Sequence, residues 1–210
     1  MVDFQSRDTQ RDRDGDDASA DDDPPTPDQS EAEAAPASAE PADGDADDPE
    51  RGVAVVSIGG DRSIDDDPAG DAAVAEVEAA DGRVVTRELI DASFDGVQKT
   101  VDALVDRRDV YAVVTTGGTG VEPDDVTVEA VRQMFDKELP GFGELVRRSC
   151  YDEVGAAVIR TRATAGVMGG VACFCLPGDP DVVRRSVRDV VAPEAEYTAA
   201  LAAPDDASES

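Results

Sequence analysis

Apolar and polar residues alternate along the chain with two distinct spacings. Short apolar runs bounded by glycine, aspartate or proline predict strands at residues 53–58, 83–90, 110–115 and 171–176. Between them, apolar residues recur three or four positions apart. This spacing predicts amphipathic helices at 73–80, 97–105, 128–135, 142–151 and 181–191, and a further turn or short helix at 192–201. The run at 110–115 is apolar at consecutive positions, as expected for a strand covered on both faces.

This order of elements predicts an α/β fold. Because strands and helices alternate throughout, we expect a mainly parallel sheet with helices on both faces. Ligands of such sheets bind beyond the carboxyl ends of the strands. The sequence therefore predicts that the segments at 57–60, 90–91, 115–120 and 177–180 meet at one edge of the sheet and form the binding site.

Composition separates the chain into one domain and two tails. Residues 1–50 contain 18 acidic residues and three arginines, with almost no apolar residue larger than alanine. Such a segment cannot bury enough surface to offset its ordering entropy, so we expect it to be disordered. Residues 51–203 have the size of one ordinary domain, and residues 204–210 are expected to form a short disordered tail.

The charge of the chain limits the classes of partner and the salt conditions that we expect for it. The formal net charge is −30, and the chain has only two lysines, Lys99 and Lys137, and no histidine or tryptophan. An acidic surface shared by tail and body favours a protein adapted to high salt, where screening weakens self-repulsion; an ordinary acidic cytosolic protein is the alternative. No basic stripe is present to meet a nucleic-acid backbone, so nucleic acid is not expected as a partner.

The remaining composition favours a cytoplasmic protein without metal-binding cysteines. No stretch approaches the roughly 20 apolar residues of a membrane span, and the acidic N-terminus does not resemble a signal peptide. Three cysteines do not form a disulfide framework. Cys173 and Cys175 would share one face of a strand, while Cys150 is distant in sequence, so core packing is expected rather than a zinc site.

The most concentrated chemistry lies in the segment VVTTGGTGVEPDDVT, residues 113–127. Successive backbone N–H groups at Thr115, Thr116, Gly117, Gly118, Thr119 and Gly120 could form an anion-binding nest, although a plain strand-to-helix turn has the same glycine content. The segment is neither a Walker A loop nor a GxGxxG fingerprint. Carboxylates beside a phosphate nest, here Glu122, Asp124 and Asp125, require a bridging cation such as Mg²⁺. Asp125 could also cap the helix that begins near Thr127.

Other acidic residues offer further candidates. Asp91 ends the second predicted strand and would point into the same edge of the sheet; the alternative is a turn or helix-capping aspartate before Val97. The acids at 65–67 could bind metal but are expected to form a solvated loop, and 177–180 (PGDP) could be a rigid turn only. Because the chain has no histidine, catalytic triads that use one are excluded.

Several motifs, in this order, resemble the MoaB/MogA family of molybdenum cofactor biosynthesis proteins. They are SIGGD (57–61), DPAGD (67–71), TTGGTGVEPDDVT (115–127), PGFGE (140–144), RTRATAGVMGG (160–170) and LPGDP (176–180). The resemblance extends from residue 53 to about residue 191 and therefore covers the predicted domain almost completely.

The resemblance implies a fold, an activity and an assembly. The fold is a three-layer αβα arrangement of the molybdopterin-binding type, and the assembly is a trimer or a hexamer. The activity is adenylylation of molybdopterin by ATP with Mg²⁺, which releases pyrophosphate and prepares the pterin for molybdenum or tungsten insertion, a step that would involve a MoeA-like metal-insertion protein.

Motif positions assign roles to particular residues. By this resemblance Asp91 and Asp125 match the two carboxylates important for catalysis, which would also hold Mg²⁺. The segment Thr115–Gly120 matches the loop that contacts phosphate. The residues expected to line the same pocket are Ser57, Glu144, Pro177 and Gly178.

Two departures keep alternatives open. Asp124 stands where relatives often have arginine, which removes a positive charge beside the phosphate site, and the first loop reads SIGGD in place of a serine-rich stretch. A protein that binds molybdopterin without catalysis is therefore one alternative. A CinA-like nucleotide-cleaving domain of the same fold is another, although GGTGVEPDDVT favours the molybdenum family.

Overall fold

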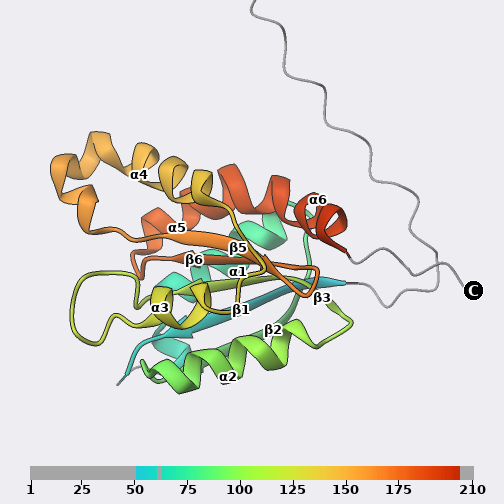
Figure 1. The fold of residues 1–210 in the computed structure, drawn as a ribbon. Helices are drawn as coiled ribbons and strands as arrows, with labels where there is room; N and C mark the ends of the chain where they lie inside the picture. Colours follow the sequence, from blue (N-terminus) through green and yellow to red (C-terminus); the bar gives the residue numbers. More distant parts are fainter. Residues whose placement is uncertain (1–50, 61–62, 204–210) are drawn as a thin grey trace, which may run out of the picture. The chain divides into compact units, whose positions relative to one another are not determined.

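The apolar runs predicted as strands form four adjacent strands of a six-stranded sheet in a computed structural model that describes residues 51–60 and 63–203 (Figure 1). The predicted tails at 1–50 and 204–210 lie outside these residues. The elements, in chain order, are β1 (Gly52–Ile58), η1 (Ile64–Asp66), α1 (Pro68–Ala79), β2 (Val84–Ile90), α2 (Phe94–Val105), β3 (Val110–Thr116), α3 (Thr127–Arg132), β4 (Lys137–Glu138), α4 (Pro140–Val154), η2 (Gly155–Arg160), β5 (Thr164–Met168), β6 (Val171–Leu176), α5 (Pro180–Ser186), η3 (Val187–Val191) and α6 (Ala192–Ala202).

The sheet is mixed but mainly parallel, as predicted. Its strand order is β2-β1-β3-β6-β5-β4, and β2, β1, β3 and β6 run parallel to one another. Their carboxyl ends therefore lie at the same edge, with Ser57 of β1 opposite Thr116 of β3 and Thr116 opposite Leu176 of β6. This register brings the predicted strand-end loops together.

The antiparallel strands β4 and β5 were not predicted. β5 is rich in small residues, and a side chain at its Gly166 would overlap the ring of Phe135, so the strand lacks the run of large β-branched residues that marks the others. β4 contains only Lys137 and Glu138 and forms the edge of the sheet. A short charged edge strand of this kind discourages pairing with other chains.

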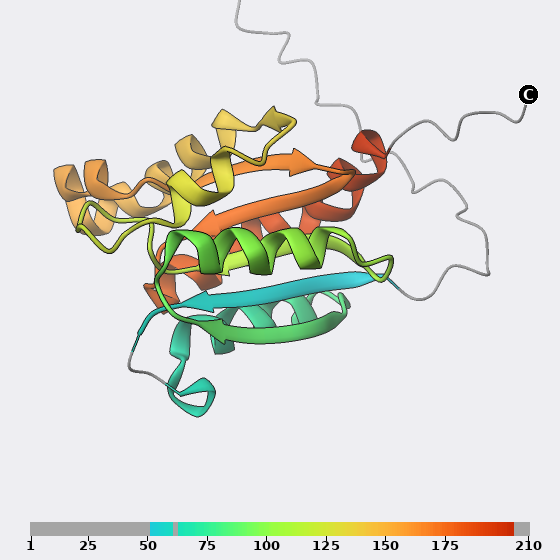
Figure 2. The same ribbon diagram turned by 60° about the horizontal axis from the view of Figure 1, so that its bottom comes forward.

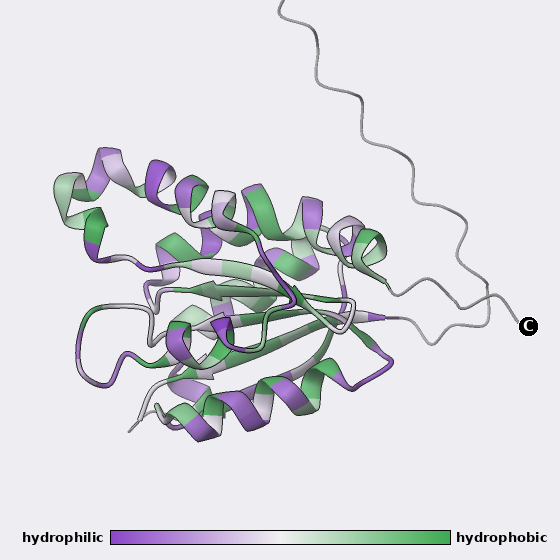
Figure 3. Cartoon of the chain, viewed as in Figure 1, coloured by the Kyte–Doolittle hydropathy of each residue, from purple (hydrophilic) through white to green (hydrophobic). Residues whose placement is uncertain are grey.

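Alternate residues of the strands face two separate cores, which confirms the three-layer arrangement. Val55 of β1 and Val114 of β3 pack with α1, α4, α5 and α6 on one face of the sheet. Val56 and Val113 pack with α2 and α3 on the other face. Figure 2 shows α1 and α2 on opposite sides of the strands. In Figure 3 the strands are mostly apolar and the helices carry polar residues on their outer sides.

Most helix boundaries differ from the predicted ones by a few residues. α1 begins at Pro68, earlier than the apolar spacing suggested, because Asp67 caps its first turn. α3 ends at Arg132, and the segment predicted at 181–191 continues through a π-helical turn, η3, into α6. None of the helices in residues 51–60 and 63–203 is long and apolar enough to cross a membrane. The three cysteines are free and buried, in agreement with the prediction of core packing.

Candidate active site

The loops that follow β1, β2, β3 and β6 line one cavity of about 680 Å³. Gly59 and Gly60 come from the first loop, Asp91 from the second and Gly178 from the fourth. The third loop, which joins β3 to α3, contributes most of the remaining lining: Gly117, Gly118, Asp124 and Asp125. The predicted convergence of four strand ends is therefore confirmed, and the charged residues among those that line the cavity are three aspartates.

Glycine is required at the start of the third loop. Gly117 and Gly118 have φ values of +94° and +66°, a region that residues with a side chain rarely adopt. A side chain at Gly117 would overlap the carbonyl oxygen of Ile58. The N–H of Gly117 donates to the carbonyl oxygen of Leu176 at 2.9 Å, so this part of the predicted nest is already bonded. Among the described residues, the N–H groups of Gly118, Thr119 and Gly120 have no acceptor.

Asp125 is held inside this loop and does not cap α3. Its Oδ2 accepts a hydrogen bond from the N–H of Glu122 at 2.8 Å, and the same oxygen lies against Gly120. The residue that precedes α3 is Val126, and no side chain caps the helix. The predicted capping role is thus wrong, because the carboxylate closes the preceding turn instead.

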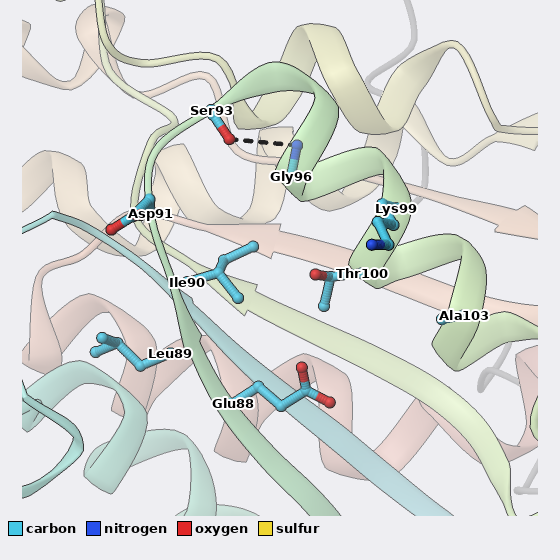
Figure 4. A pocket seen from close by; sticks show the side chains of 9 residues that line it. All are labelled: Glu88, Leu89, Ile90, Asp91, Ser93, Gly96, Lys99, Thr100 and Ala103. Carbon is cyan, nitrogen blue, oxygen red and sulfur yellow. Dashed lines mark hydrogen bonds between the residues drawn. The ribbon is translucent and has the colours of Figure 1, made fainter.

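Asp91 follows the last residue of β2, and Ser93 provides the cap that Asp91 could have supplied. The hydroxyl of Ser93 accepts from the N–H of Gly96 at 3.3 Å at the start of α2. Figure 4 shows this bond in an adjoining cavity of about 500 Å³, which includes Asp91 and Lys99. In this view the carboxyl group of Asp91 is turned away from Lys99. The side chain of Asp91 is therefore free to serve the cavity at the sheet edge.

Ser57 and Thr116 lie in a buried polar network and do not line either cavity described above. The hydroxyl of Thr116 donates to Ser57 Oγ at 3.2 Å, and the hydroxyl of Ser57 donates to Asp67 Oδ2 at 2.5 Å. Asp67 also accepts from the N–H of Gly70 at 3.0 Å and forms an ion pair with Arg87 at 3.0 Å. This network ties the ends of β1 and β3 to α1 and β2.

Asp67 itself was predicted to belong to a solvated loop, and the structure corrects this. Its side chain is 2% exposed, whereas Asp65 and Asp66 are exposed as expected. Burial raises the pKa of Asp67, but the hydrogen bonds from Ser57, Gly70 and Arg87 outweigh burial, and the net pKa lies below 3.8. A signal for this role was present in the sequence, since aspartate before proline often caps a helix.

A second cavity of about 400 Å³ also borders the third loop. It shares Gly118, Asp125 and Gly178 with the first cavity and adds Pro177, so the predicted PGDP turn borders both. Its further lining includes Thr119, Gly120, Cys150, Arg160 and Asp179. Arg160 gives this cavity a cationic side chain, which the first cavity lacks among its lining residues.

Besides Ser57 and Thr116, two further predicted site residues line neither the first nor the second cavity. Thr115 is fully buried in β3 beside its register partner Cys175, on the face of the sheet that packs against α2 and α3. Glu144 is exposed on α4 and lines neither cavity. Neither residue is among those that line the two cavities, and the contact of each with a ligand stays a prediction.

Arg162 is a residue of the site that the sequence reasoning did not single out. Its Nε donates to the carbonyl oxygen of Gly120 at 2.6 Å, and a terminal nitrogen donates to the carbonyl oxygen of Asp125 at 3.0 Å. It also forms an ion pair with Glu129 of α3. Arg162 belongs to the RTRATAGVMGG motif, but the motif alone gives no indication that its second arginine reaches back to the third loop.

Comparisons with known proteins show the family to which the chain belongs. A family model described as "Probable molybdopterin binding domain" matches residues 54–197. The chain is 36% identical over 141 residues to "Molybdenum cofactor biosynthesis protein B" of Bacillus subtilis, covering 67% of this chain and 83% of the relative. It is 37% identical over 137 residues to "Molybdopterin adenylyltransferase" of Pyrococcus furiosus, covering 63% of this chain and 79% of the relative.

A solved structure shares the fold and much of the sequence. The crystal structure of a molybdenum cofactor biosynthesis protein B superposes with a TM-score of 0.69 at 31% identity, covering 74% of this chain and 97% of that one. The family model spans more than half of the chain, and the relatives match over most of their length. The chain therefore belongs to the MoaB/MogA family of molybdopterin-binding proteins.

Proposed function

We propose that this chain is a molybdopterin adenylyltransferase, which transfers the adenylyl group of ATP to the terminal phosphate of molybdopterin and releases pyrophosphate. The observation that carries the proposal is the meeting of Asp91 and Asp125 with glycine backbone in one cavity of about 680 Å³. Two carboxylates beside unpaired backbone N–H groups suit a reaction between phosphates. The name of the Pyrococcus furiosus relative supports the same activity.

The reaction needs no nucleophilic side chain. A phosphate oxygen of molybdopterin forms a bond to the α-phosphorus of ATP, and the bond from that phosphorus to the α,β-bridging oxygen breaks, so pyrophosphate leaves. The attacking oxygen is already ionised near neutral pH, which agrees with a chain that contains no histidine. Catalysis then depends on positioning the two phosphates and on offsetting their charge.

The third loop provides the positioning. The N–H groups of Gly118, Thr119 and Gly120, which have no acceptor among the described residues, would donate to phosphate oxygens. The loop keeps its form because Gly117 and Thr127 anchor it to the ends of β6 and β3. Donors that are fixed before the substrate binds stabilise developing charge without reorganising.

Asp91 and Asp125 fit a magnesium ion that arrives with ATP. Among residues 51–60 and 63–203, no three His, Cys, Asp or Glu side chains come together as a metal cluster, so a site formed by protein alone is not indicated. Mg²⁺ commonly binds through one or two carboxylates and completes its octahedron with phosphates and water. Asp91 and Asp125 would hold the ion, which when bound offsets phosphate charge in an otherwise acidic cavity.

We also propose that the chain assembles into a trimer or a hexamer. Leu145, Tyr151 and Val154 of α4 are each about half exposed, and Ile159 of η2 is 79% exposed. Large exposed apolar side chains on these two consecutive elements favour contact with another subunit. Light scattering coupled to size exclusion should give three or six times the mass of the chain, and a monomer at micromolar concentration would contradict assembly.

An adenylylation assay tests the function. The full-length chain is incubated with molybdopterin and MgATP in concentrated KCl, and adenylyl-molybdopterin and pyrophosphate are measured by mass spectrometry and a coupled assay. Asp125→Ala should abolish product while leaving the fold intact, and Asp65→Ala, which removes an exposed carboxylate outside the cavity, should not. If wild-type protein binds molybdopterin but forms no adenylylated product, the chain is a binding protein and the proposed activity fails.

A further inference from the structure

Arg162 joins three backbone carbonyl groups of the loop that carries Asp125. Its main-chain N–H donates to Thr119 at 3.1 Å, its Nε to Gly120 at 2.6 Å, and a terminal nitrogen to Asp125 at 3.0 Å. Thr119 and Gly120 begin the turn that Asp125 ends. One residue therefore fixes both sides of the turn, from a segment 37 to 43 positions further along the chain.

The geometry of Asp125 depends on both sides of that turn. Its Oδ2 accepts from the N–H of Glu122 at 2.8 Å and lies against Gly120. Arg162 holds the carbonyl oxygens of Gly120 and of Asp125 itself. If those two carbonyl groups moved apart, the carboxylate would lose the surface on which it rests, and its direction into the cavity would change.

The guanidinium group is itself oriented by Glu129. The two side chains pair through both nitrogens of the fork, with one contact at 3.2 Å, and the hydrogen bond from Arg162 holds the pKa of Glu129 below its ordinary value. A planar fork with five donors can serve a carboxylate and two carbonyl groups at once, which a lysine cannot. Arginine at this position is thus matched to its three acceptors.

Arg162 does not line the cavity that contains Asp91 and Asp125. It borders a separate hollow of about 570 Å³ together with Glu129, Arg132 and Arg147. Any effect of Arg162 on the chemistry at Asp125 would therefore pass through the loop and not through contact with substrate.

We propose that Arg162 is a positioning residue for the adenylyl transfer, which locks the turn at 119–125 so that the Asp125 carboxylate and the unpaired N–H groups of Gly118–Gly120 are held beside the two cavities that this loop lines. This inference rests on the proposed function for its kinetic part. Its structural part, the locking of the turn, stands on the hydrogen bonds alone.

The test uses three variants of the full-length chain. Arg162→Met removes the side-chain donors and keeps an apolar stem, and Arg162→Lys keeps the charge without the fork. Arg132→Met is the matched control, since Arg132 also pairs with an exposed carboxylate, Glu138, but donates to no carbonyl group of the turn at 119–125. We expect Arg162→Met to lower kcat by roughly 100-fold, the loss that misplacement of a reacting group by about 1 Å can cause, with KM for ATP changed by less than about threefold. Arg162→Lys should recover little, and Arg132→Met should remain near wild type.

Hydrogen exchange separates the two parts of the inference. The amides of Glu122 and Asp125, which are hydrogen-bonded within the turn, should exchange faster in Arg162→Met, while amides of β1 and β3 keep wild-type protection and Arg132→Met changes neither. Unchanged exchange in the loop, or a kcat within twofold of wild type in an active enzyme, overturns the positioning role. If wild-type protein makes no adenylylated product but the loop still loosens in Arg162→Met, the proposed function fails and the locking of the turn stands.

Discussion

The hydroxyl of Thr127 donates a hydrogen bond to the carbonyl oxygen of Gly117 at 2.9 Å, and its main-chain N–H donates to Gly118 at 3.0 Å. The first residue of α3 thus holds both glycines that follow β3. A side chain on Gly118 would occupy the place of the Thr127 hydroxyl. The close approach and the positive φ of Gly118, +66°, have the same consequence: only glycine suits this position.

Replacing Gly118 by alanine should therefore damage both stability and activity. A non-glycine residue in this backbone region costs about 1–2 kcal/mol, and displacement of Thr127 adds to that cost. Because Gly118 borders both cavities, we expect a loss of product formation larger than the loss of stability alone would give. Urea unfolding and the adenylylation assay measure the two effects.

Gly141→Ala is the matched control. Gly141 lies in the first turn of α4, has no atom within 4 Å of the place where a side chain would extend, and does not have a positive φ. Alanine there should be neutral or stabilising by about 0.4–1 kcal/mol. Equal behaviour of the two variants would show that the conformation assigned to Gly118 is wrong.

The buried Asp67 makes a prediction about pH. The bonds from Ser57, Gly70 and Arg87 depress its folded pKa below 3.8 in spite of burial, so the ionised form stabilises the fold. This contribution is fully present above pH 3.8 and is lost as the pH falls through the lower, folded value. Asp67→Asn should therefore be less stable than wild type at neutral pH, and the difference should shrink in acid.

The comparison of two proteins at each pH is essential here. The chain carries 49 acidic residues, and their protonation changes the overall repulsion in both proteins alike. The difference in unfolding free energy between wild type and Asp67→Asn cancels this shared contribution. A difference that stays constant from neutral pH to well below 3.8 would mean that Asp67 is not ionised in the fold.

The parts of the fold that could be predicted are those where local pattern and burial agree. Strands β1, β3 and β6 are rich in apolar residues and covered on both faces, so each appears as an apolar run, and the edge on which Asp91 and Asp125 meet follows from their parallel order. β5 was not predicted, because the ring of Phe135 occupies the space beside Gly166. This is a contact between two separate segments, and no local sequence pattern contains it.

The same distinction applies to the site. Glycines and carboxylates at strand ends can be recognised in the sequence, whereas the residues that hold them in place cannot. Asp67 and Asp65 are both acids of one short stretch, and only the packing of β1 against α1 shows that Asp67 is buried against Ser57. Arg162 meets Asp125 across 37 positions of chain, so its role depends on tertiary structure.

Asp124 offers a test of charge at the cavity. It is exposed and lines the cavity with Asp91 and Asp125. Asp124→Arg replaces a side chain that repels phosphate by one that attracts it, so KM for ATP should fall several-fold in dilute salt. The fall should be smaller in concentrated salt, because the Debye length is only about 3 Å at 1 M and the charges are screened. Asp65→Arg changes the net charge equally at an exposed position outside the cavity and should leave KM unchanged. The same fall in KM in both variants would indicate a general effect of net charge.

The salt adaptation suggested by composition predicts that KCl stabilises the fold. With a net charge of −30 and 19 basic residues, compaction brings carboxylates together, and this repulsion weakens as the Debye length falls from about 10 Å at 0.1 M to about 3 Å at 1 M. The free energy of unfolding should therefore rise with KCl, most steeply below about 1 M, where screening changes most.

A shorter chain that starts at Arg51 shows where this dependence originates. It lacks the 18 acidic residues and three arginines of the first 50 positions, and it keeps a net charge of −15. We expect it to fold, since β1 begins only at Gly52, and to retain a clear stabilisation by KCl because the repulsion within the domain itself remains. Urea unfolding of both chains across KCl concentrations is the measurement. Folding of the shorter chain with no dependence on KCl would assign the salt response to the first 50 residues and contradict an adapted domain surface.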